Sequence, residues 1–309
     1  MTAGRGEYAE GYGGAVAASG DVWASWVLAQ DPDGGEPAGR AAGPLAGFRD
    51  GVLARAAVAE GDVLLDVGAG AGLIGLGALD RVGPGGQVIF SDISAELLAE
   101  CRRRAQALGA VQRCRFVQAG AEDLGEIADR SVDVVTTRSV LIYVPDRPAA
   151  FAEFFRVLRP GGRLSIFEPI NRFAVGESRW LLFGFDLAPV AELAGKLARA
   201  YARRPPEQDP MLNFDERDLL RWARDAGFTA VELDYRAEVE VPQPLPTTDW
   251  DTLKQMAPNP LAPTYEQAMA EALTPDERAR LEDHIRATLA AGGTARRTLA
   301  TAYLRATRP

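Results

Sequence analysis

A glycine-rich segment in the first third of the chain has the residue types of a ligand-binding turn. It reads Leu65-Asp66-Val67-Gly68-Ala69-Gly70-Ala71-Gly72 and overlaps the end of the short apolar run Val63-Leu64-Leu65. Glycines between a strand and a helix let a ligand come close to the backbone, because they carry no side chain and tolerate positive φ. The segment therefore predicts a small-molecule site where a strand ends.

Two alignments of this segment predict different ligands. Gly70, Gly72 and Gly75 have the spacing of the dinucleotide fingerprint, which by itself is a weak signal. That alignment would place Gly68 and a buried Asp66 inside the strand, and a buried charge without a partner is costly. We therefore expect Asp66 to end the strand and the glycines to form the turn, with no need for a pyrophosphate at the helix N-terminus.

A second acidic residue, Asp92, follows the next apolar run, Gln87 to Ser91. An acid at the end of the second strand of an α/β sheet can accept hydrogen bonds from both hydroxyls of a ribose. Together with the glycine turn, Asp92 therefore predicts a ligand that contains a nucleoside.

The elements that must position these residues alternate along the chain. We expect strands at 63–65, 87–91, 115–118, 132–137 and 163–167, and helices at 72–82 and 94–108. Ser94, Asp146 and Asp215 are suited to cap helices, and Thr274-Pro275-Asp276-Glu277 has the form of a capping box. The alternation predicts an α/β fold, with a parallel sheet covered by helices on both faces.

Four regions follow from this pattern. Residues 1–50 are interpreted as an N-terminal helical lid and 51–170 as the ligand-binding core. The rhythm breaks at 171–212, where Trp180, Phe183 and Phe185 mark a helical insertion that either covers the active site or fills a helical core. Residues 213–309 return to the core sheet and contain a second insertion, of which 242–291 has no assigned role.

The core resembles the class I methyltransferases that depend on S-adenosylmethionine (SAM). The resemblance spans about Asp62 to Pro169. It rests on the glycine segment, on Asp92-Ile93-Ser94, on Val134-Val135 followed by residues 139–146, and on the block 156–164, which reads Arg-Val-Leu-Arg-Pro-Gly-Gly-Arg-Leu. It implies a Rossmann-like, seven-stranded, mostly parallel sheet whose last strand is antiparallel, with 230–241 and 298–304 as the final two strands.

The resemblance also implies roles for individual residues. The methionine part of SAM would be lined by Gly68, Ala69 and Gly70, with its ammonium positioned by Asp66. Asp92 would hold the ribose hydroxyls, Ile93 would pack on the adenine, and Ala121 would offer its backbone N–H. Gly120 stands where the family often has Asp, so Glu122 or Asp123 would replace that contact. Arg138 would face SAM and contact either the methionine carboxylate or an anionic substrate.

Methyl transfer from a sulfonium is an in-line displacement, which depends mainly on alignment and needs a base only when the nucleophile carries a proton. The candidates for such a base are Glu168, at the carboxyl end of the fifth strand, and Tyr143. Alternatively, Glu168 pairs with a nearby arginine such as Arg172. His284 lies in a polar helical segment, where we expect it at the surface.

The charge and composition of the chain limit the kinds of partner that it is expected to bind. Acidic residues outnumber basic ones by 43 to 34, which gives a net charge of −9 and argues against nucleic acid as a partner. Neither a membrane-spanning run nor a secretion signal is expected, so we predict a soluble, cytoplasmic protein with a small-molecule acceptor, a metabolite or a natural product; a homodimer stays open. Cys101 and Cys114 are expected to be ordinary thiols, and no spacing indicates a metal site.

Two rival functions remain open at this stage. One is a non-catalytic protein that binds SAM on the same fold. The other is an NAD(P)-dependent oxidoreductase, which requires the dinucleotide alignment of Gly70, Gly72 and Gly75 and a proton donor that the sequence does not obviously supply.

Overall fold

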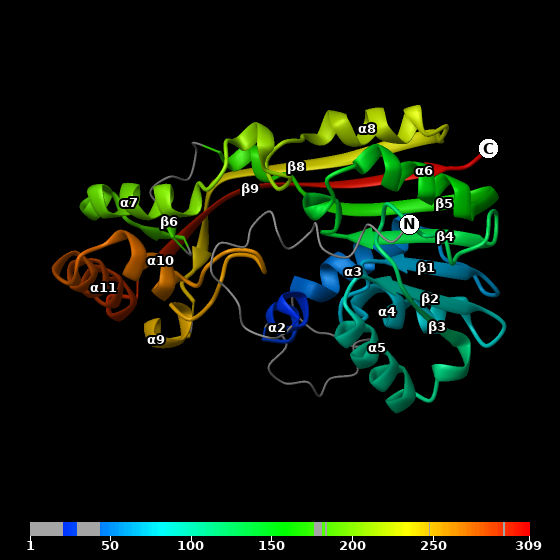
Figure 1. Cartoon of the computed structure of the whole chain (residues 1–309), viewed down its shortest axis with the longest axis horizontal. Coiled ribbons are helices and arrows are strands. Elements are labelled where there is room, and N and C mark those ends of the chain that lie inside the picture. Colours follow the sequence, from blue (N-terminus) through cyan, green and yellow to red (C-terminus); the bar gives the residue numbers. More distant parts are fainter. Residues whose placement is uncertain (1–20, 30–43, 176–180, 183, 247, 293) are drawn as a thin grey trace, which may run out of the picture. The chain divides into compact units, whose positions relative to one another are not determined.

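The computed structural model describes residues 21–29, 44–175, 181–182, 184–246, 248–292 and 294–309 (Figure 1). The chain divides into two compact units. The larger comprises the described residues of 27–173, 207–237 and 300–309, and the smaller comprises those of 1–26, 174–206 and 238–299. Trp180 and Phe183 lie outside the described residues.

A seven-stranded sheet forms the centre of the larger unit, in the order β3-β2-β1-β4-β5-β9-β8. Strands β1 to β5 pair in parallel, and β9 pairs antiparallel with β5, so that Phe167 lies opposite Tyr303. The strands are β1 (Val63–Val67), β2 (Gln87–Asp92), β3 (Cys114–Gln118), β4 (Val132–Arg138), β5 (Leu158–Pro169), β8 (Thr229–Pro244) and β9 (Thr294–Thr307). The α/β fold class and the antiparallel strand beside β5 are confirmed.

Helices cover both faces of this sheet (Figure 1). One face packs on α3 (Pro44–Arg55), α4 (Leu73–Val82) and α5 (Ala95–Ala107), and the other packs on α6 (Arg147–Val157) and α8 (Glu216–Asp225). Successive side chains of β1 point to opposite faces of the sheet. Leu64 packs in the apolar core on the side of α3, α4 and α5, and Leu65 packs in the apolar core on the side of α6 and α8. The shorter elements near the sheet are α2 (Val22–Ala29), η2 (Val111–Arg113), η3 (Leu141–Tyr143) and η4 (Asn171–Ala174).

Several helix starts agree with the sequence because their caps are local. The side chains of Ser94, Asp146 and Asp215 accept backbone hydrogen bonds at the starts of α5, α6 and α8. The capping box at Thr274 begins α11, with Pro275 in the first turn. Each of these contacts joins residues no more than four positions apart, which is why the sequence alone reveals them.

The smaller unit has an apolar core of its own. Trp250, Phe185 and Met269 are buried there with ten further apolar side chains. Its elements are β6 (Leu181–Leu182), β7 (Phe185–Asp186), η5 (Ala188–Val190), α7 (Ala191–Tyr201), η6 (Pro206–Gln208), α9 (Trp250–Leu253), α10 (Tyr265–Ala272) and α11 (Pro275–Ala290), together with the ends of β8 and β9. The interpretation of 171–212 as purely helical was incomplete, since β6 and β7 form a two-stranded antiparallel sheet within it.

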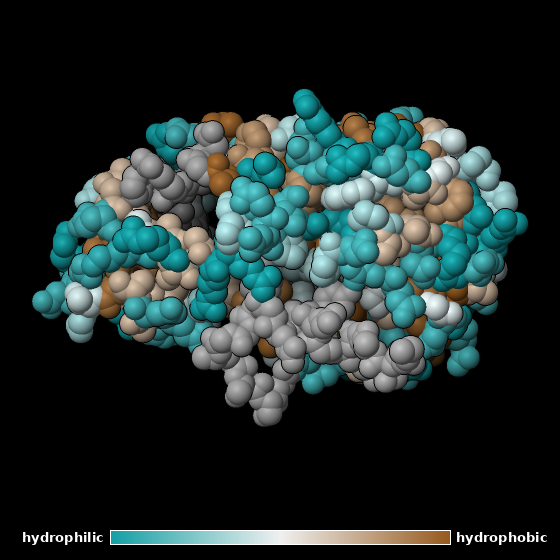
Figure 2. All heavy atoms as spheres, turned by 45° about the horizontal axis from the view of Figure 1, so that its top comes forward, coloured by the Kyte–Doolittle hydropathy of each residue, from teal (hydrophilic) through white to brown (hydrophobic). Residues whose placement is uncertain are grey.

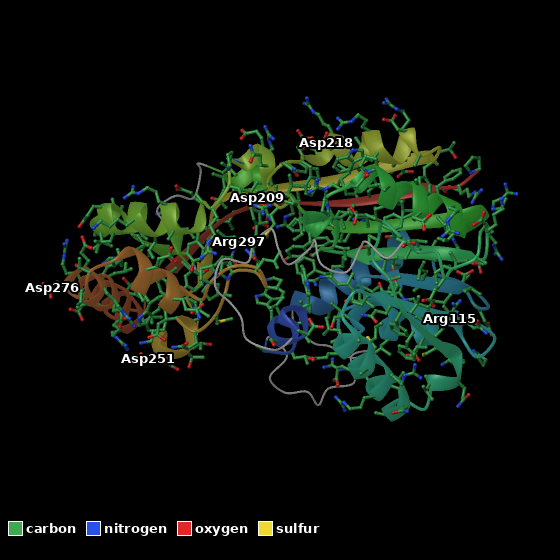
Figure 3. The ribbon with its side chains drawn as sticks, viewed as in Figure 1. Arg115, Asp209, Asp218, Asp251, Asp276 and Arg297 are labelled. Carbon is green, nitrogen blue, oxygen red and sulfur yellow. The ribbon has the colours of Figure 1, made fainter. Side chains whose placement is uncertain are left out.

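Charged side chains are numerous at the surface. Asp251 of α9 pairs with Lys254 and with Arg286, both at 2.9 Å, and Asp276 lies in the first turn of α11 (Figure 3). His284 was expected at the surface and is half-buried, with its Nε2 2.7 Å from the carbonyl oxygen of Asp186. Figure 2 shows a face on which hydrophilic side chains predominate and apolar ones are scattered. Within the described residues, no helix is both long enough and apolar enough to cross a membrane.

Candidate cofactor site

The glycine turn after β1 is packed tightly at Gly68 and less tightly at Gly70. Gly68 and Gly70 adopt φ values of +64° and +55°, which favour glycine. A Cβ atom at Gly68 would come within 2.3 Å of Val140 Cγ2, whereas the nearest atom to one at Gly70 would be Val27 Cγ1 at 3.9 Å. Among the described residues, a side chain would therefore meet a close contact at Gly68 and only ordinary van der Waals contact at Gly70.

Asp92 joins this turn to the end of β2. The backbone N–H of Gly70 donates to Asp92 Oδ2 at 2.8 Å, and that of Ser94 donates to Oδ1 at 2.9 Å. A further hydrogen bond of 2.9 Å runs from the Ala69 N–H to the Ser91 carbonyl. The acid and the glycines that the sequence singled out thus lie in direct contact.

The segment after β3 completes the same edge of the sheet. The Ala119 N–H donates to the Asp92 carbonyl at 3.1 Å, and Gln118 Nε2 donates to the Ile93 carbonyl at 3.0 Å. Ala121, two residues further, is buried. Ile93 and Ala121 therefore lie on segments that are tied to each other at this edge.

Glu122 already has a structural partner. Its Oε1 accepts the Asp146 N–H at 2.7 Å, and burial raises the pKa of its carboxyl group. The contact links the segment after β3 to the start of α6. A carboxylate so engaged has one oxygen less to offer an adenine amino group.

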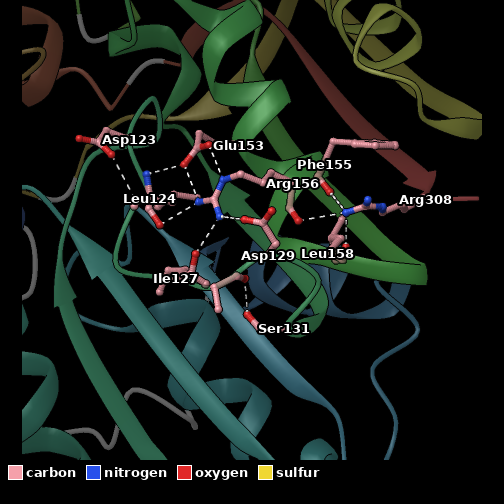
Figure 4. A network of polar contacts seen from close by, with 12 residues as sticks. Asp123, Leu124, Ile127, Asp129, Ser131, Glu153, Phe155, Arg156, Leu158 and Arg308 are labelled. Carbon is pink, nitrogen blue, oxygen red and sulfur yellow. Dashed lines mark hydrogen bonds and ion pairs between the residues drawn. The ribbon is translucent and has the colours of Figure 1, made fainter.

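Arg156 holds the continuation of this segment in place (Figure 4). Its guanidinium donates to the Leu124 carbonyl at 3.0 Å and to the Ile127 carbonyl at 2.9 Å. Glu153 pairs with Arg156 and also accepts the Leu124 N–H at 2.7 Å. Both polar groups of the Leu124 backbone are thus fixed by α6, which limits the movement of residues just before it.

Asp66 corrects one expectation from the sequence. It does not end β1 but lies inside the strand, 1% exposed. Its Oδ2 accepts the Gly75 N–H at 2.8 Å, and its Oδ1 accepts the Thr136 hydroxyl at 3.0 Å. These partners reduce the cost of burial that we expected to exclude an acid here, although burial still raises the pKa of Asp66 to about 7.

Arg138 ends β4 and lies opposite Phe167 of β5. Its guanidinium lies over the Phe48 ring, 5.2 Å from the centroid, and burial lowers its pKa. The Nε atom is buried, and among the described residues it has no hydrogen-bond partner. Arg138 thus places a cation with an unused donor close to the glycine turn, since the preceding residue Thr137 pairs with Val67.

Of the two residues considered as bases, Glu168 is fully buried and Tyr143 is partly buried. The Glu168 carboxylate is completely buried and accepts three backbone N–H groups, from Val140, Leu141 and Ile142. Burial raises the pKa of Tyr143, and the neighbouring Glu168 adds to the effect. A tyrosine with a raised pKa forms a phenolate less readily, which weakens it as a base.

Three residues near the site were not identified from the sequence. Val27 of α2 approaches Gly70, Val140 lies against Gly68, and Phe48 of α3 lies under the Arg138 guanidinium. Each is an ordinary apolar residue in sequence, and only its position in the fold brings it to the glycine turn or to Arg138. No local pattern could have marked them.

Comparison with known proteins identifies the family. Residues 65–166 match the family model described as a methyltransferase domain. A ubiquinone/menaquinone biosynthesis C-methyltransferase from Cronobacter sakazakii is 32% identical over 182 residues, which cover 56% of this chain and 69% of that protein. The chain belongs to the class I SAM-dependent methyltransferases.

Two further matches show how much of the chain and of each relative is shared. A ubiquinone/menaquinone biosynthesis C-methyltransferase from Xylella fastidiosa is 35% identical over 151 residues, and the match covers 49% of this chain and 57% of that protein. The crystal structure of a Bacillus halodurans protein assigned as a methyltransferase has a TM-score of 0.51 at 16% identity, and the match covers 86% of this chain and 99% of that one. This last likeness concerns the fold alone.

The residues of this methyltransferase fit SAM as the cofactor. Among the described residues, the nearest neighbour of a Cβ at Gly70 is at van der Waals distance, and the Gly70 N–H holds the Asp92 carboxylate next to the turn. The prediction of SAM as cofactor is confirmed by the family, which leaves the dinucleotide alignment of Gly70, Gly72 and Gly75 without support. The individual contacts to SAM remain predictions.

Proposed function

We propose that the chain transfers a methyl group from SAM to a small-molecule acceptor, a metabolite or a natural product, by in-line displacement. The net charge of −9 disfavours a polyanionic acceptor such as nucleic acid. The relatives from Cronobacter sakazakii and Xylella fastidiosa are named for ubiquinone and menaquinone biosynthesis, and a small organic acceptor is in keeping with those names.

The observation that carries the proposal is the hydrogen bond from Gly70 to Asp92, which brings the two sequence signals for a nucleoside ligand into one site. We propose that Gly68, Ala69 and Gly70 line the methionine part of SAM and that Asp92 accepts from the ribose. Ile93 and Ala121 would contact the adenine, with Glu122 beside them. Asp66 would act on the ammonium through the turn that it supports, and Arg138 would bind a carboxylate of SAM or of the acceptor.

When bound, SAM supplies an electrophilic methyl group on a sulfonium sulfur. The task of the chain is then to hold the acceptor in line with that methyl group and to exclude water, and positioning of this kind is worth about 7–11 kcal/mol of the barrier. The raised pKa of Tyr143 and the occupied oxygens of Glu168 do not favour a general base at either residue. We therefore propose a displacement that relies on alignment, for which an acceptor with a readily lost proton is best suited.

Three predictions from the sequence enter this proposal. Residues 1–50 and 171–212 are proposed to cover the acceptor, the alternative for 171–212 being the filling of an apolar core, in which Phe185 is buried. Limited proteolysis with and without SAM tests the first alternative. A homodimer is to be tested by sedimentation. A cytoplasmic location is in keeping with the free thiols of Cys101 and Cys114 and is to be tested by cell fractionation.

Calorimetry on wild type and on Asp92→Ala tests the proposed cofactor site. We expect wild type to bind SAM and its demethylated product but not NAD(P)H, and Asp92→Ala to weaken SAM binding by about tenfold to a hundredfold, since a charge-assisted hydrogen bond contributes roughly 1.5–3 kcal/mol. Asp80→Ala, an exposed acid on α4, is the matched control and should bind as wild type does.

The proposal fails if wild type binds a nicotinamide cofactor in place of SAM. It also fails in part if methyl transfer from labelled SAM occurs to RNA or protein but to no small molecule. Binding of SAM without transfer to any acceptor would favour the non-catalytic alternative.

A further inference from the structure

Glu168 has an unusual set of partners for an acid at the carboxyl edge of the sheet. It lies one residue before the end of β5. Its Oε1 accepts the backbone N–H groups of Val140 and Leu141, both at 2.9 Å, and its Oε2 accepts that of Ile142 at 3.3 Å. Both oxygens therefore bind the turn that follows β4.

That turn has a conformation that requires support. Ser139 adopts a φ of +55°, which costs a residue with a side chain about 1–2 kcal/mol. Its N–H donates to the Phe167 carbonyl at 2.8 Å, next to Glu168, while Arg147 Nε donates to the Leu141 carbonyl at 2.9 Å. The turn is thus fixed by β5 on one side and by α6 on the other.

Val140 connects this turn to the glycine turn. A Cβ atom at Gly68 would lie 2.3 Å from Val140 Cγ2 and 3.1 Å from Cγ1, so the Val140 side chain packs directly on the Gly68 backbone. Close-packed interiors transmit small shifts, because neither partner can move without a gap or a clash. The positions of Val140 and Gly68 are therefore coupled.

These contacts suit support better than proton transfer. A general base must lie within hydrogen-bond reach of the proton that it removes. The Glu168 carboxylate has no exposed surface, and its oxygens face the backbone of residues 140–142. Burial raises the pKa of Glu168 to about 7, and the three converging N–H groups oppose this shift because they favour the ionised form. When the group is ionised, these are charge-assisted hydrogen bonds, which a neutral side chain cannot reproduce.

We propose that Glu168 is a positioning residue of the cofactor site. Its carboxylate fixes residues 140–142, Val140 then fixes Gly68, and the affinity for SAM depends on this series of contacts. The inference rests on the proposed function, because it takes Gly68 to line the cofactor. It replaces the earlier interpretation of Glu168 as a base.

Two variants test the series at different points. Glu168→Gln keeps the shape of the side chain but turns an amide NH2 toward an N–H donor. We expect the Kd and the KM for SAM to rise at least tenfold. The kcat at saturating SAM should stay within about threefold. Val140→Ala keeps the backbone N–H groups and removes the contact to Gly68, and its Kd should rise about threefold to fivefold. Asp62→Asn, a buried acid before β1 at the opposite edge of the sheet, should lower stability but keep the Kd.

The division between kcat and KM decides between support and base chemistry. If folded Glu168→Gln binds SAM as wild type does, or loses kcat with an unchanged Kd, the proposal is overturned. Should Glu168→Gln fail to fold, as judged by circular dichroism, an unchanged Kd for Val140→Ala overturns it. If wild type itself binds no SAM, the proposed function fails. If wild type binds SAM and the variants bind it equally well, only the inference about Glu168 fails.

Discussion

The two edges of the parallel sheet treat their buried acids differently. At the amino edge, Asp62 pairs with Arg163 at 2.6 Å and Asp133 pairs with Arg159, and each of these acids also accepts a backbone N–H at 2.8 Å. At the carboxyl edge, Asp66 and Glu168 also accept hydrogen bonds from backbone N–H groups, and Asp66 accepts one from a threonine hydroxyl. The difference is that, among the described residues, the two acids named at the first edge have an arginine partner and the two named at the second have none.

This difference suits the two edges to different roles, one in stability and one in ligand binding. Arg308 donates to the carbonyls of Phe155, Arg156 and Leu158, so side-chain cations also hold the backbone around the start of β5 (Figure 4). Ligands of open α/β sheets bind beyond the carboxyl ends of the strands. On the proposed function, the acids at that edge hold the turns that contact the ligand, and we expect the ion pairs at the amino edge to contribute to stability.

The largest expected effect is on cofactor binding at the carboxyl edge. Gly68→Ala would force a Cβ to within 2.3 Å of Val140 Cγ2 and strain a residue with φ of +64°. We expect calorimetry to show a loss of SAM affinity of about a hundredfold, or about 2.7 kcal/mol. The comparison between edges predicts that no glycine at the amino edge has this effect.

Gly61→Ala is the matched control for this substitution. Gly61 precedes β1 and has a φ of +86°, but in the described part of the chain no atom beyond its own chain neighbours lies within 4 Å of the position of its Cβ. The variant should be less stable because of backbone strain alone and should keep the wild-type affinity for SAM. A similar loss of affinity in both variants would show that strain, and not the contact to Val140, governs the site.

A smaller effect is expected on stability at the amino edge. Asp62→Asn leaves the Arg163 guanidinium without its anionic partner and should lower the free energy of unfolding in urea by about 2 kcal/mol. The exposed pair of Arg305 and Glu232 offers a control, and Glu232→Gln should change stability much less. Weaker SAM binding by Asp62→Asn, with unchanged stability, would contradict the division between edges.

The smallest effect is the pH dependence that Asp66 contributes to stability. Burial raises its pKa from the ordinary 3.8 to about 7, so between these pH values the folded chain holds a proton that the unfolded chain has lost. This contribution is present at low pH and is lost as the pH rises through about 7. Asp66→Asn removes it, and relative to wild type the variant should gain about 0.8 kcal/mol between pH 6.5 and pH 8 in urea unfolding.

The pKa of Glu100 is shifted in the opposite direction to that of Asp66, so its contribution to stability has the opposite pH dependence. Its hydrogen bond with Arg103 lowers its pKa to about 2, so the stability that it contributes is present above about pH 4.5 and is lost as the pH falls toward 2. Glu100→Gln should therefore leave the slope between pH 6.5 and pH 8 unchanged. A slope unaffected by Asp66→Asn would mean that its carboxyl group keeps an ordinary pKa.

The sequence predicted much of the fold because many signals are local. The helix predicted at 72–82 is observed as Leu73–Val82, and the strand predicted at 87–91 extends by one residue, to Asp92. The final strands were expected at 230–241 and 298–304 and are longer, Thr229–Pro244 and Thr294–Thr307, because apolar alternation says where a strand lies better than where its pairing stops. The β6–β7 pair was missed, since two-residue strands carry no periodic signal.

What the sequence determined by itself was the place of the glycine turn and of the acid beside it, since Gly68, Gly70 and Asp92 are marked by residue type and by their place after a strand. What only the tertiary structure decided was how that turn is held. The Asp66 carboxylate accepts the hydroxyl of Thr136, seventy residues away in sequence, and Glu168 at the end of β5 accepts the N–H of Val140, which follows the neighbouring strand β4. The cost of a buried carboxylate depends on such distant partners, and no local pattern can supply them.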